Sequence, residues 1–374
     1  MTARWQVLAG ALALALALAG CSSGPDRPKP KPYEAIAAPI AGKQVWSQRI
    51  GGIDFPLSVA AQGGVFTVAS GDGTVAAVQA DTGREVWRTS VGGRIAAGVG
   101  SDGRYAAVVT REGELVVLDG GKPLWRKPVG TKVVTAPLVA GERVFVLGVD
   151  RRVAAWDALD GRKLWQQQRP GEPLTLAQGG VLAAFKNTLL VGQGPRLAGL
   201  DPLSGNVRWE VPVASPRGTN EVERIADLVA PLVRRGDSVC ARAFQSAVGC
   251  VDAERGNLQW SKNVGGTEGI AGNEQVVVGA DASDRITAWQ AAGGEVAWSS
   301  EALLYRSLGA PQVAGPTAVF VDGEGMVHWL SLAKGQTMLR LPTDGSAPAA
   351  APAVSGTTLL VVTRNGGLHA FRPE

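Results

Sequence analysis

A tryptophan recurs seven times along this chain at nearly constant spacing. Successive members are 41, 38, 40, 44, 51 and 38 residues apart, and Leu339 stands 41 residues after the last, where an eighth would fall. A repeat of about 40 residues that carries several short strands is typical of a β-propeller, in which each repeat forms one blade. The seven are Trp46, Trp87, Trp125, Trp165, Trp209, Trp260 and Trp298.

Each tryptophan ends a recurring phrase of an apolar run, a polar turn with glycine, and a second run. Ala76–Trp87 reads AAVQADTGREVW, and Gly249–Trp260 reads GCVDAERGNLQW. We expect the indole ring to fill the space between adjacent blades, with its N–H bonded to a backbone carbonyl. The turn glycines of the phrase are Gly83, Gly121, Gly161, Gly205, Gly256, Gly294 and Gly335.

The two ends of the repeat region complement each other. Gly366–Glu374 (GGLHAFRPE) stops before a tryptophan strand, and Gly42–Gly52 (GKQVWSQRIGG) begins with one. Joining the two completes a blade and removes open sheet edges. The sequence therefore predicts an all-β, eight-bladed β-propeller of four-stranded antiparallel blades over residues 42–374, closed by the N-terminal strand. Seven blades is the alternative, if the repeat of Leu339 does not form one.

The first residues have the layout of a bacterial export signal. Arg4 precedes the apolar run Val7–Ala19, and Leu18-Ala19-Gly20-Cys21 resembles the lipobox of bacterial lipoproteins. This resemblance implies a signal peptide over residues 1–20 and a lipid on Cys21, with an N-terminal lipid anchor in the membrane. Ser22 follows the cysteine, which by the same resemblance implies the outer membrane. Residues 21–41, rich in Pro, Lys and Ala, are expected to be a lipidated flexible tether.

The charge of the chain gives little support for nucleic-acid binding. The formal net charge is +4, and it is +3 once a leader containing Arg4 is removed. The densest basic stretch is Arg27–Pro32, which lies in the predicted tether rather than on a blade. We therefore expect no nucleic-acid partner.

Cys240 and Cys250 lie on two predicted consecutive strands. A three-residue loop centred on Gln245 would place them opposite each other, and a two-residue loop would put them on opposite faces. An exported protein is permitted a disulfide. Of a disulfide and two free cysteines, we expect two free cysteines whose small thiols are buried.

The residues also bear on two other classes of propeller protein, quinone-dependent dehydrogenases and sugar-binding propellers. The repeat resembles that of pyrroloquinoline quinone dehydrogenases, but those enzymes are longer and cover their cofactor with insertions. The chain has two histidines, His328 and His369, both in strand-like runs, so we expect no catalytic residues, no metal and no cofactor. A sugar-binding propeller would expose aromatics at the channel mouth; core packing is expected instead for Trp156, Trp289 and Trp329.

Three short segments of the sequence support a more specific family resemblance. Glu324–Gly335 (EGMVHWLSLAKG), Leu303–Pro311 (LLYRSLGAP) and Asn220–Leu228 (NEVERIADL) are similar to segments of the BamB family of lipoproteins. The resemblance runs from Cys21 to the C-terminus. It implies a non-enzymatic scaffold in the outer-membrane β-barrel assembly complex, with its propeller in the periplasm, monomeric within a hetero-oligomeric complex. In that family the propeller aids folding and insertion of β-barrel proteins into the outer membrane.

The resemblance also implies a binding face for the POTRA domains of the barrel-forming subunit. Ala177 replaces an arginine of the family pattern, so the apolar pair Leu174 and Leu176 should carry more of the contact. From the residues alone, these leucines could be strand core, and Arg224 and Asp227 could be a solvated turn. Unfolded barrel precursors are a second possible partner, through strand addition at a blade edge. The assigned partner-binding residues are Leu174, Leu176, Glu223, Arg224, Asp227 and Arg306.

Overall fold

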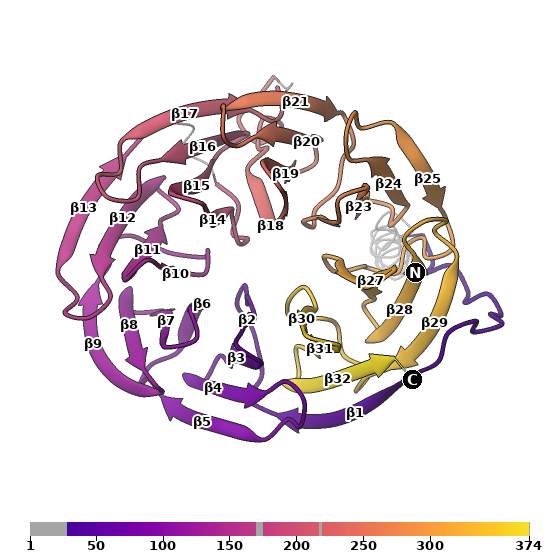
Figure 1. Ribbon diagram of the computed structural model, residues 1–374, viewed down its shortest axis with the longest axis horizontal. Helices are drawn as coiled ribbons and strands as arrows, with labels where there is room; N and C mark the ends of the chain where they lie inside the picture. The colour runs from indigo at the N-terminus through magenta and orange to yellow at the C-terminus, as the bar shows by residue number, and fades with distance from the viewer. Residues whose placement is uncertain (1–27, 170–174, 217–218, 374) are drawn as a thin grey trace, which may run out of the picture.

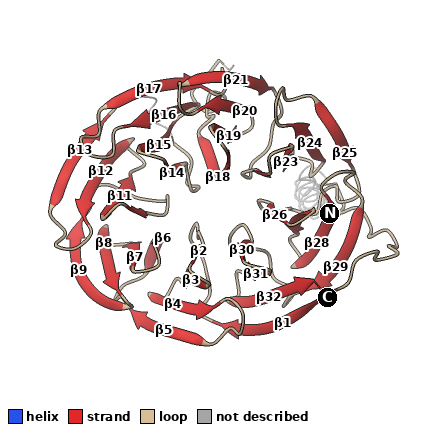
Figure 2. Cartoon of the chain, viewed as in Figure 1, coloured by secondary structure: helices blue, strands red, loops and turns tan. Residues whose placement is uncertain are grey.

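The protein is a closed ring of eight four-stranded antiparallel sheets around a central axis (Figure 1). A computed structural model describes residues 28–169, 175–216 and 219–373. Those residues form strands and loops and contain no helix (Figure 2). The prediction of an all-β, eight-bladed propeller is confirmed, and the alternative of seven blades is wrong.

Blades 1 to 4 follow one another along the chain, each running from an inner strand to an outer one. Their strands are β2 (Ala60–Gln62), β3 (Val65–Ala69), β4 (Thr74–Gln79) and β5 (Glu85–Ser90); β6 (Ile95–Ser101), β7 (Tyr105–Thr110), β8 (Glu114–Asp119) and β9 (Lys122–Pro128); β10 (Leu138–Ala140), β11 (Arg143–Leu147), β12 (Arg152–Asp157) and β13 (Lys163–Gln168); β14 (Leu182–Phe185), β15 (Thr188–Gln193), β16 (Arg196–Leu200) and β17 (Val207–Pro212).

Blades 5 to 7 repeat this order, and blade 8 takes its outer strand from the start of the chain. Their strands are β18 (Leu228–Arg235), β19 (Ser238–Ala243), β20 (Ala247–Asp252) and β21 (Asn257–Lys262); β22 (Ala271–Gly272), β23 (Val276–Ala280), β24 (Ile286–Gln290) and β25 (Val296–Ser300); β26 (Gln312–Ala314), β27 (Thr317–Val321), β28 (Met326–Ser331) and β29 (Thr337–Pro342); β30 (Ala353–Ser355), β31 (Thr358–Val362), β32 (Gly367–Pro373) and β1 (Gly42–Arg49).

The N-terminal strand closes the ring as the sequence predicts. β1 pairs with β32 from Gly42 opposite Pro373 to Arg49 opposite Gly367. The core lies between blades rather than inside one, so the middle strands are buried on both faces; all six residues of β7, for example, are buried. The outer strands are mostly exposed or half-buried, as in β5 and β9.

The repeated tryptophan of one blade packs on the repeated glycine of the next. A Cβ atom placed at any of the seven turn glycines would lie 2.3–2.7 Å from the indole of the preceding blade. The indole N–H of Trp46 donates to the carbonyl of Ala80 at 3.0 Å, and that of Trp125 to Ala158 at 2.8 Å. The structural interpretation of the tryptophans is therefore confirmed.

Leu339 serves the eighth junction by packing on the equivalent glycine. Its side chain faces Gly42 of β1, which stands four residues before Trp46, and a Cβ atom there would lie 2.8 Å from Cδ2 of Leu339. The smaller leucine is supplemented by Trp329 and Phe371, whose rings meet edge to face at 5.5 Å in the same cluster. A blade can thus form without the tryptophan.

The two cysteines contradict the expectation of free thiols. Cys240 and Cys250 are directly opposite on β19 and β20 and form a disulfide. The loop between the paired Ala243 and Ala247 has three residues, of which Gln245 takes φ of 49°. This is the loop length that the sequence required for a bond, and the left-handed central residue makes it fit.

Candidate functional site

Two loops that the sequence singles out meet on one face of the ring. The loop from β13 to β14 contains Leu176, and the loop from β17 to β18 contains Asp227. The backbone N–H of Leu176 donates to Oδ2 of Asp227 at 2.9 Å, although the two residues are 51 positions apart. Arg151 Nη2 lies 3.9 Å from Oδ1 of the same carboxylate. Asp227 therefore ties the two loops together.

Residues 219–224 form a turn with its own internal bonds. The Asn220 side chain accepts the N–H of Glu223 at 2.9 Å, and the Glu223 carboxylate accepts the N–H of Thr219 at 2.7 Å. This reciprocal arrangement resembles a helix capping box. The hydrogen bonds from Thr219 hold the pKa of the Glu223 carboxyl below its usual value. The turn is thus ordered while the Glu223 side chain stays exposed.

The remaining predicted residues on this face fall in two situations, and one residue that was not predicted joins them. Arg224 follows Glu223 in the turn and is half-buried, as is Leu176. Leu174 lies outside the described residues. Val222, which the sequence analysis missed, is 67% exposed at the turn. The sequence could have indicated Val222, because it is an apolar residue between two glutamates in the longest inter-blade loop. We call Leu176 together with residues 219–227 the loop face.

Arg306 does not belong to the loop face. It lies in the loop between β25 and β26, which connects blade 6 to blade 7, and it is buried. Its Nε donates to Oδ2 of Asp322 at 2.9 Å, and its Nη2 contacts Glu324 at 2.6 Å. Its Nη1 donates to the carbonyl of Lys31 at 2.8 Å, within the predicted tether. In this structure Arg306 is engaged within the chain, so it is not part of the surface that the loops present.

Asp322 is the centre of a buried polar cluster in blade 7. It is 0% exposed, and its Oδ2 also accepts from Tyr33 at 2.7 Å and from His328 at 3.0 Å. These bonds hold the pKa of the Asp322 carboxyl well below its usual range, against the effect of burial. Arg340 Nε lies 3.2 Å from Nδ1 of His328. Because a guanidinium only donates, Nδ1 is the acceptor and the His328 proton is on Nε2.

The two histidines predict a loss of stability in mild acid. Burial lowers the pKa of His328 and of His369 below the usual value of about 6.5. The unfolded chain therefore takes up these protons at higher pH than the folded chain, so the free energy of unfolding falls as pH drops below about 6.5.

Denaturant unfolding at pH 7.5 and 5.5 measures this loss. His328→Gln keeps a donor for Asp322 and cannot titrate, so the loss between the two pH values should be smaller in the variant. An equal loss in both proteins would contradict the assignment of a neutral His328.

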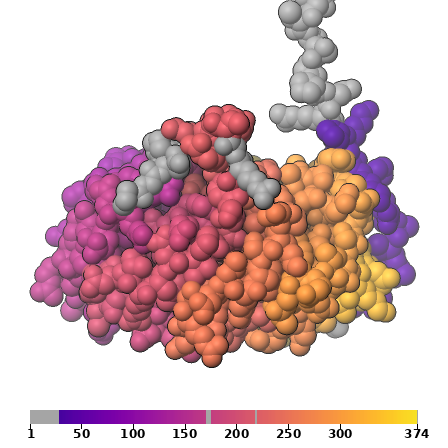
Figure 3. All heavy atoms as spheres, turned by 90° about the horizontal axis from the view of Figure 1, so that it is seen from above, coloured from indigo at the N-terminus to yellow at the C-terminus, as the bar shows by residue number. Residues whose placement is uncertain are grey.

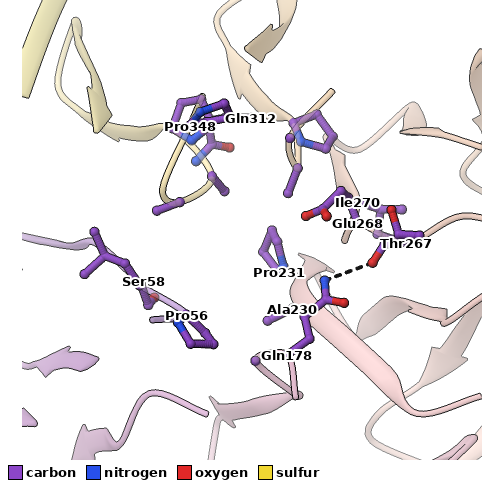
Figure 4. A pocket seen from close by; sticks show the side chains of 18 of the residues that line it. Pro56, Ser58, Gln178, Ala230, Pro231, Thr267, Glu268, Ile270, Gln312 and Pro348 are labelled. Carbon is purple, nitrogen blue, oxygen red and sulfur yellow. Dashed lines mark hydrogen bonds between the residues drawn. The ribbon is translucent and has the colours of Figure 1, made fainter. Parts of the chain in front are cut away.

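The ring encloses a central cavity of about 1320 Å³. Side chains and backbone from the inner strands line it, with Pro56, Gln178, Pro231 and Pro348 around its wall (Figure 4). Gln178 Nε2 donates to the carbonyl of Thr267 at 2.9 Å and so links the loop before blade 4 to the loop before blade 6 (Figure 4). This bond fixes the base of the loop that carries Leu176.

Two acids of the cavity wall have raised pKa values. Burial raises the pKa of Glu268, and the charges of Arg364 and Arg242 oppose that rise. Burial also raises the pKa of Asp284, against the hydrogen bonds that its carboxylate accepts from the N–H groups of Leu308 and Ser307. Across residues 28–169, 175–216 and 219–373, no group of three or more His, Cys, Asp or Glu side chains is arranged to hold a metal ion. In the same ranges, no helix has the length and apolar character needed to cross a membrane.

The aromatics weighed for sugar binding are in the core. Trp156 and Trp289 are 1% exposed, and Trp329 is also buried. The expectation of core packing is confirmed for these three residues. They give the channel mouth no stacking surface.

The chain is similar to proteins of one family over most of its length. The family profile described as outer membrane protein assembly factor BamB matches residues 35–97 and 71–300. The protein of that name from Burkholderia pseudomallei is 38% identical over 336 residues, covering 89% of this chain and 88% of the relative. That from Bordetella pertussis is 32% identical over 336 residues, covering 88% and 86%.

Solved structures agree on the fold. The crystal structure of BamB from Moraxella catarrhalis superposes with a TM-score of 0.80 at 23% identity, covering 89% of this chain and all of that one. Quinohemoprotein alcohol dehydrogenase from Comamonas testosteroni shares the propeller at a TM-score of 0.67 and 16% identity, covering 88% and 76%. The sequence relatives carry the name of an assembly factor, and this chain belongs to the BamB family of outer membrane protein assembly factors.

Proposed function

We propose that this protein is a lipid-anchored, non-enzymatic scaffold of the outer-membrane β-barrel assembly complex. A lipid on Cys21 holds it at the outer membrane, and the propeller lies in the periplasm. The loop face binds the POTRA domains of the barrel-forming subunit and thereby aids folding and insertion of barrel proteins. Family membership and the lipobox at Leu18–Cys21 support this assignment.

One observation carries the proposed binding face. Asp227 and Leu176 come from loops of neighbouring blades, and their hydrogen bond joins the loops. The joined loops present an exposed apolar residue, Val222, beside the acidic Glu223 and the basic Arg224. An apolar anchor flanked by charges of both signs suits a protein partner, since charged groups set register and apolar area supplies affinity.

Charge reversal at Arg224 tests this face. Arg224→Glu should weaken binding to the purified POTRA region by about 1–3 kcal/mol, or about 5- to 150-fold in Kd, if Arg224 pairs with a partner carboxylate. Arg255→Glu is the matched control, because Arg255 lies in the turn between β20 and β21, at the end of β20 away from the loop face. Titration calorimetry with both folded variants measures the difference. Unchanged affinity in Arg224→Glu would remove Arg224 from the interface.

The lipid anchor is tested separately. Cys21→Ser removes the thiol that accepts the lipid, so the body should move from the membrane fraction to the soluble periplasmic fraction. Fractionation and blotting measure the distribution. A Cys21→Ser protein that still pellets with outer membranes would show that something other than the lipid retains it.

Binding of unfolded precursors at blade edges has less support. In every blade a β-bulge interrupts the pairing of the outer strand one residue before the tryptophan position, as between Ala77 and Val78 opposite β5. Bulges on an edge strand disfavour the addition of another strand. We therefore assign the scaffold role to the loop face and not to the edges.

A further inference from the structure

A short segment of the predicted tether lies against blade 7. The N–H of Lys31 donates to the carbonyl of Leu304 at 2.9 Å, and the carbonyl of Lys31 accepts from Arg306 at 2.8 Å. The carbonyl of Glu34 accepts from Arg340 at 3.3 Å. Residues 31–34, here called the strap, are thus held by backbone bonds at both ends.

Tyr33 is the side chain that seats the strap. Its hydroxyl donates to Oδ2 of Asp322 at 2.7 Å, with Glu324 Oε2 at 3.2 Å. Its ring contacts two guanidinium groups, 3.6 Å from Arg306 and 4.4 Å from Arg340, measured from ring centroid to Cζ. Burial and the bond to Asp322 raise the pKa of the Tyr33 hydroxyl, so it remains a donor.

The receptor for Tyr33 is built from the blade and does not depend on the strap. Without Tyr33, the Asp322 carboxylate still accepts from Arg306 and His328 and from the N–H groups of Glu324 and Met326. The site therefore remains charge-balanced when empty. A buried carboxylate with two guanidinium groups nearby fits an aromatic ring with a hydroxyl, through cation–π contacts and one strong hydrogen bond.

The strap and the loop face lie on the same side of the ring. In Figure 3 the first described residues (indigo) and the turn around residue 220 (red) both rise from the upper side of the propeller. The connections agree, because the loop from β25 to β26 and the loop from β17 to β18 each join an outer strand to the next inner strand.

We propose that the strap, seated through Tyr33, shortens the free linker between the lipid on Cys21 and the propeller, here called the lead, and turns the loop face toward the membrane. This inference rests on the proposed lipid anchor. With the strap bound, the lead runs from Cys21 to Lys31, about ten residues with a reach of roughly 35 Å. With the strap released, the lead extends to Gly42, about twenty residues with a reach of roughly 70 Å.

Cleavage by chymotrypsin after residue 33 tests whether the strap is bound in the full-length protein. Tyr33→Phe keeps the cleavage site and the ring but loses the hydroxyl, so the 33–34 bond should be cut more than about tenfold faster than in the wild type. Tyr305→Phe is the control, since Tyr305 is exposed beside Arg306, and it should leave this rate unchanged. Mass spectrometry of the product beginning at Glu34 gives the rate. If the wild-type protein is cleaved at this bond as fast as the Tyr33→Phe variant, the proposal that Tyr33 holds the strap on blade 7 is overturned.

Energy transfer to the membrane tests the effect on the lead. A donor dye at Glu221→Cys in the lipidated protein, with acceptor lipids in phosphatidylethanolamine–phosphatidylglycerol vesicles, reports how near the loop face lies. Transfer should fall when Tyr33→Ala is added and stay unchanged when Tyr305→Ala is added. Equal transfer with and without Tyr33→Ala would overturn the proposed control of the lead.

The two experiments separate failure of the strap from failure of the anchor. Chymotrypsin cleavage does not depend on lipid, so it judges the strap alone. Vesicles that retain no wild-type protein would overturn the lipid anchor, and with it the control of the lead, whatever the cleavage rates. Retention without a change in transfer would overturn the control of the lead and leave the anchor standing.

Discussion

Replacing Asp322 by Ala is expected to lower the free energy of unfolding by about 3–5 kcal/mol. The carboxylate is fully buried and accepts hydrogen bonds from five donors among the described residues. Its removal leaves the buried Arg306 without its main counterion and the buried His328 without its acceptor. An uncompensated buried charge is costly because desolvation is no longer offset by a partner. Urea unfolding followed by circular dichroism measures the loss.

Asp54 provides the control for this substitution. It also contacts two arginines, Arg94 and Arg111, each at 2.7 Å, but its side chain is 50% exposed. Exposed pairs contribute about 0–1 kcal/mol, so Asp54→Ala should have a small effect. Equal losses in the two variants would contradict the view that the blade 7 cluster is a buried, specifically paired site.

Gly161→Ala is expected to lower the free energy of unfolding by about 2–4 kcal/mol. Gly161 has φ of 70°, where an L side chain is strained, and its Cβ would lie 2.7 Å from the indole of Trp125. The added methyl group must push the ring away and disturb the bond from Trp125 to Ala158. Thermal and urea unfolding measure the change.

Gly141→Ala separates backbone strain from the clash. Gly141 has φ of 58°, and nothing lies within 4 Å of its Cβ position. This variant should lose only about 1–2 kcal/mol, from the left-handed backbone alone. If both variants lose the same amount, the packing of tryptophan on glycine does not stabilise the junctions.

The sequence predicts the ring because its repeat has a constant length and its ends are complementary. Trp46 and the closing strand β1 are placed correctly, since Gly42–Arg49 pairs with β32 as expected. The β-bulge before each tryptophan cannot be predicted from the repeat length. The unpaired residue there, Val86 in β5, re-aims Trp87 toward the next blade and is itself exposed.

The candidate site is only partly predictable for a related reason. Spacing along the chain cannot show that Leu176 and Asp227 are bonded, because the contact depends on where two neighbouring blades bring their loops. The disulfide between Cys240 and Cys250 depends on one residue of loop length. The strap cannot be predicted from the sequence, because Tyr33 lies in a Pro- and Lys-rich segment and its partner Asp322 is far away along the chain.

The most direct test of the scaffold assignment is co-purification of the full-length protein from detergent-solubilised outer membranes, with mass spectrometry of what it captures. The wild type should recover a barrel protein that carries POTRA domains. Recovery should fall in Arg224→Glu and persist in Arg255→Glu. Recovery of no barrel partner, with a bound quinone or sugar in its place, would contradict the account and favour a cofactor-binding or sugar-binding propeller.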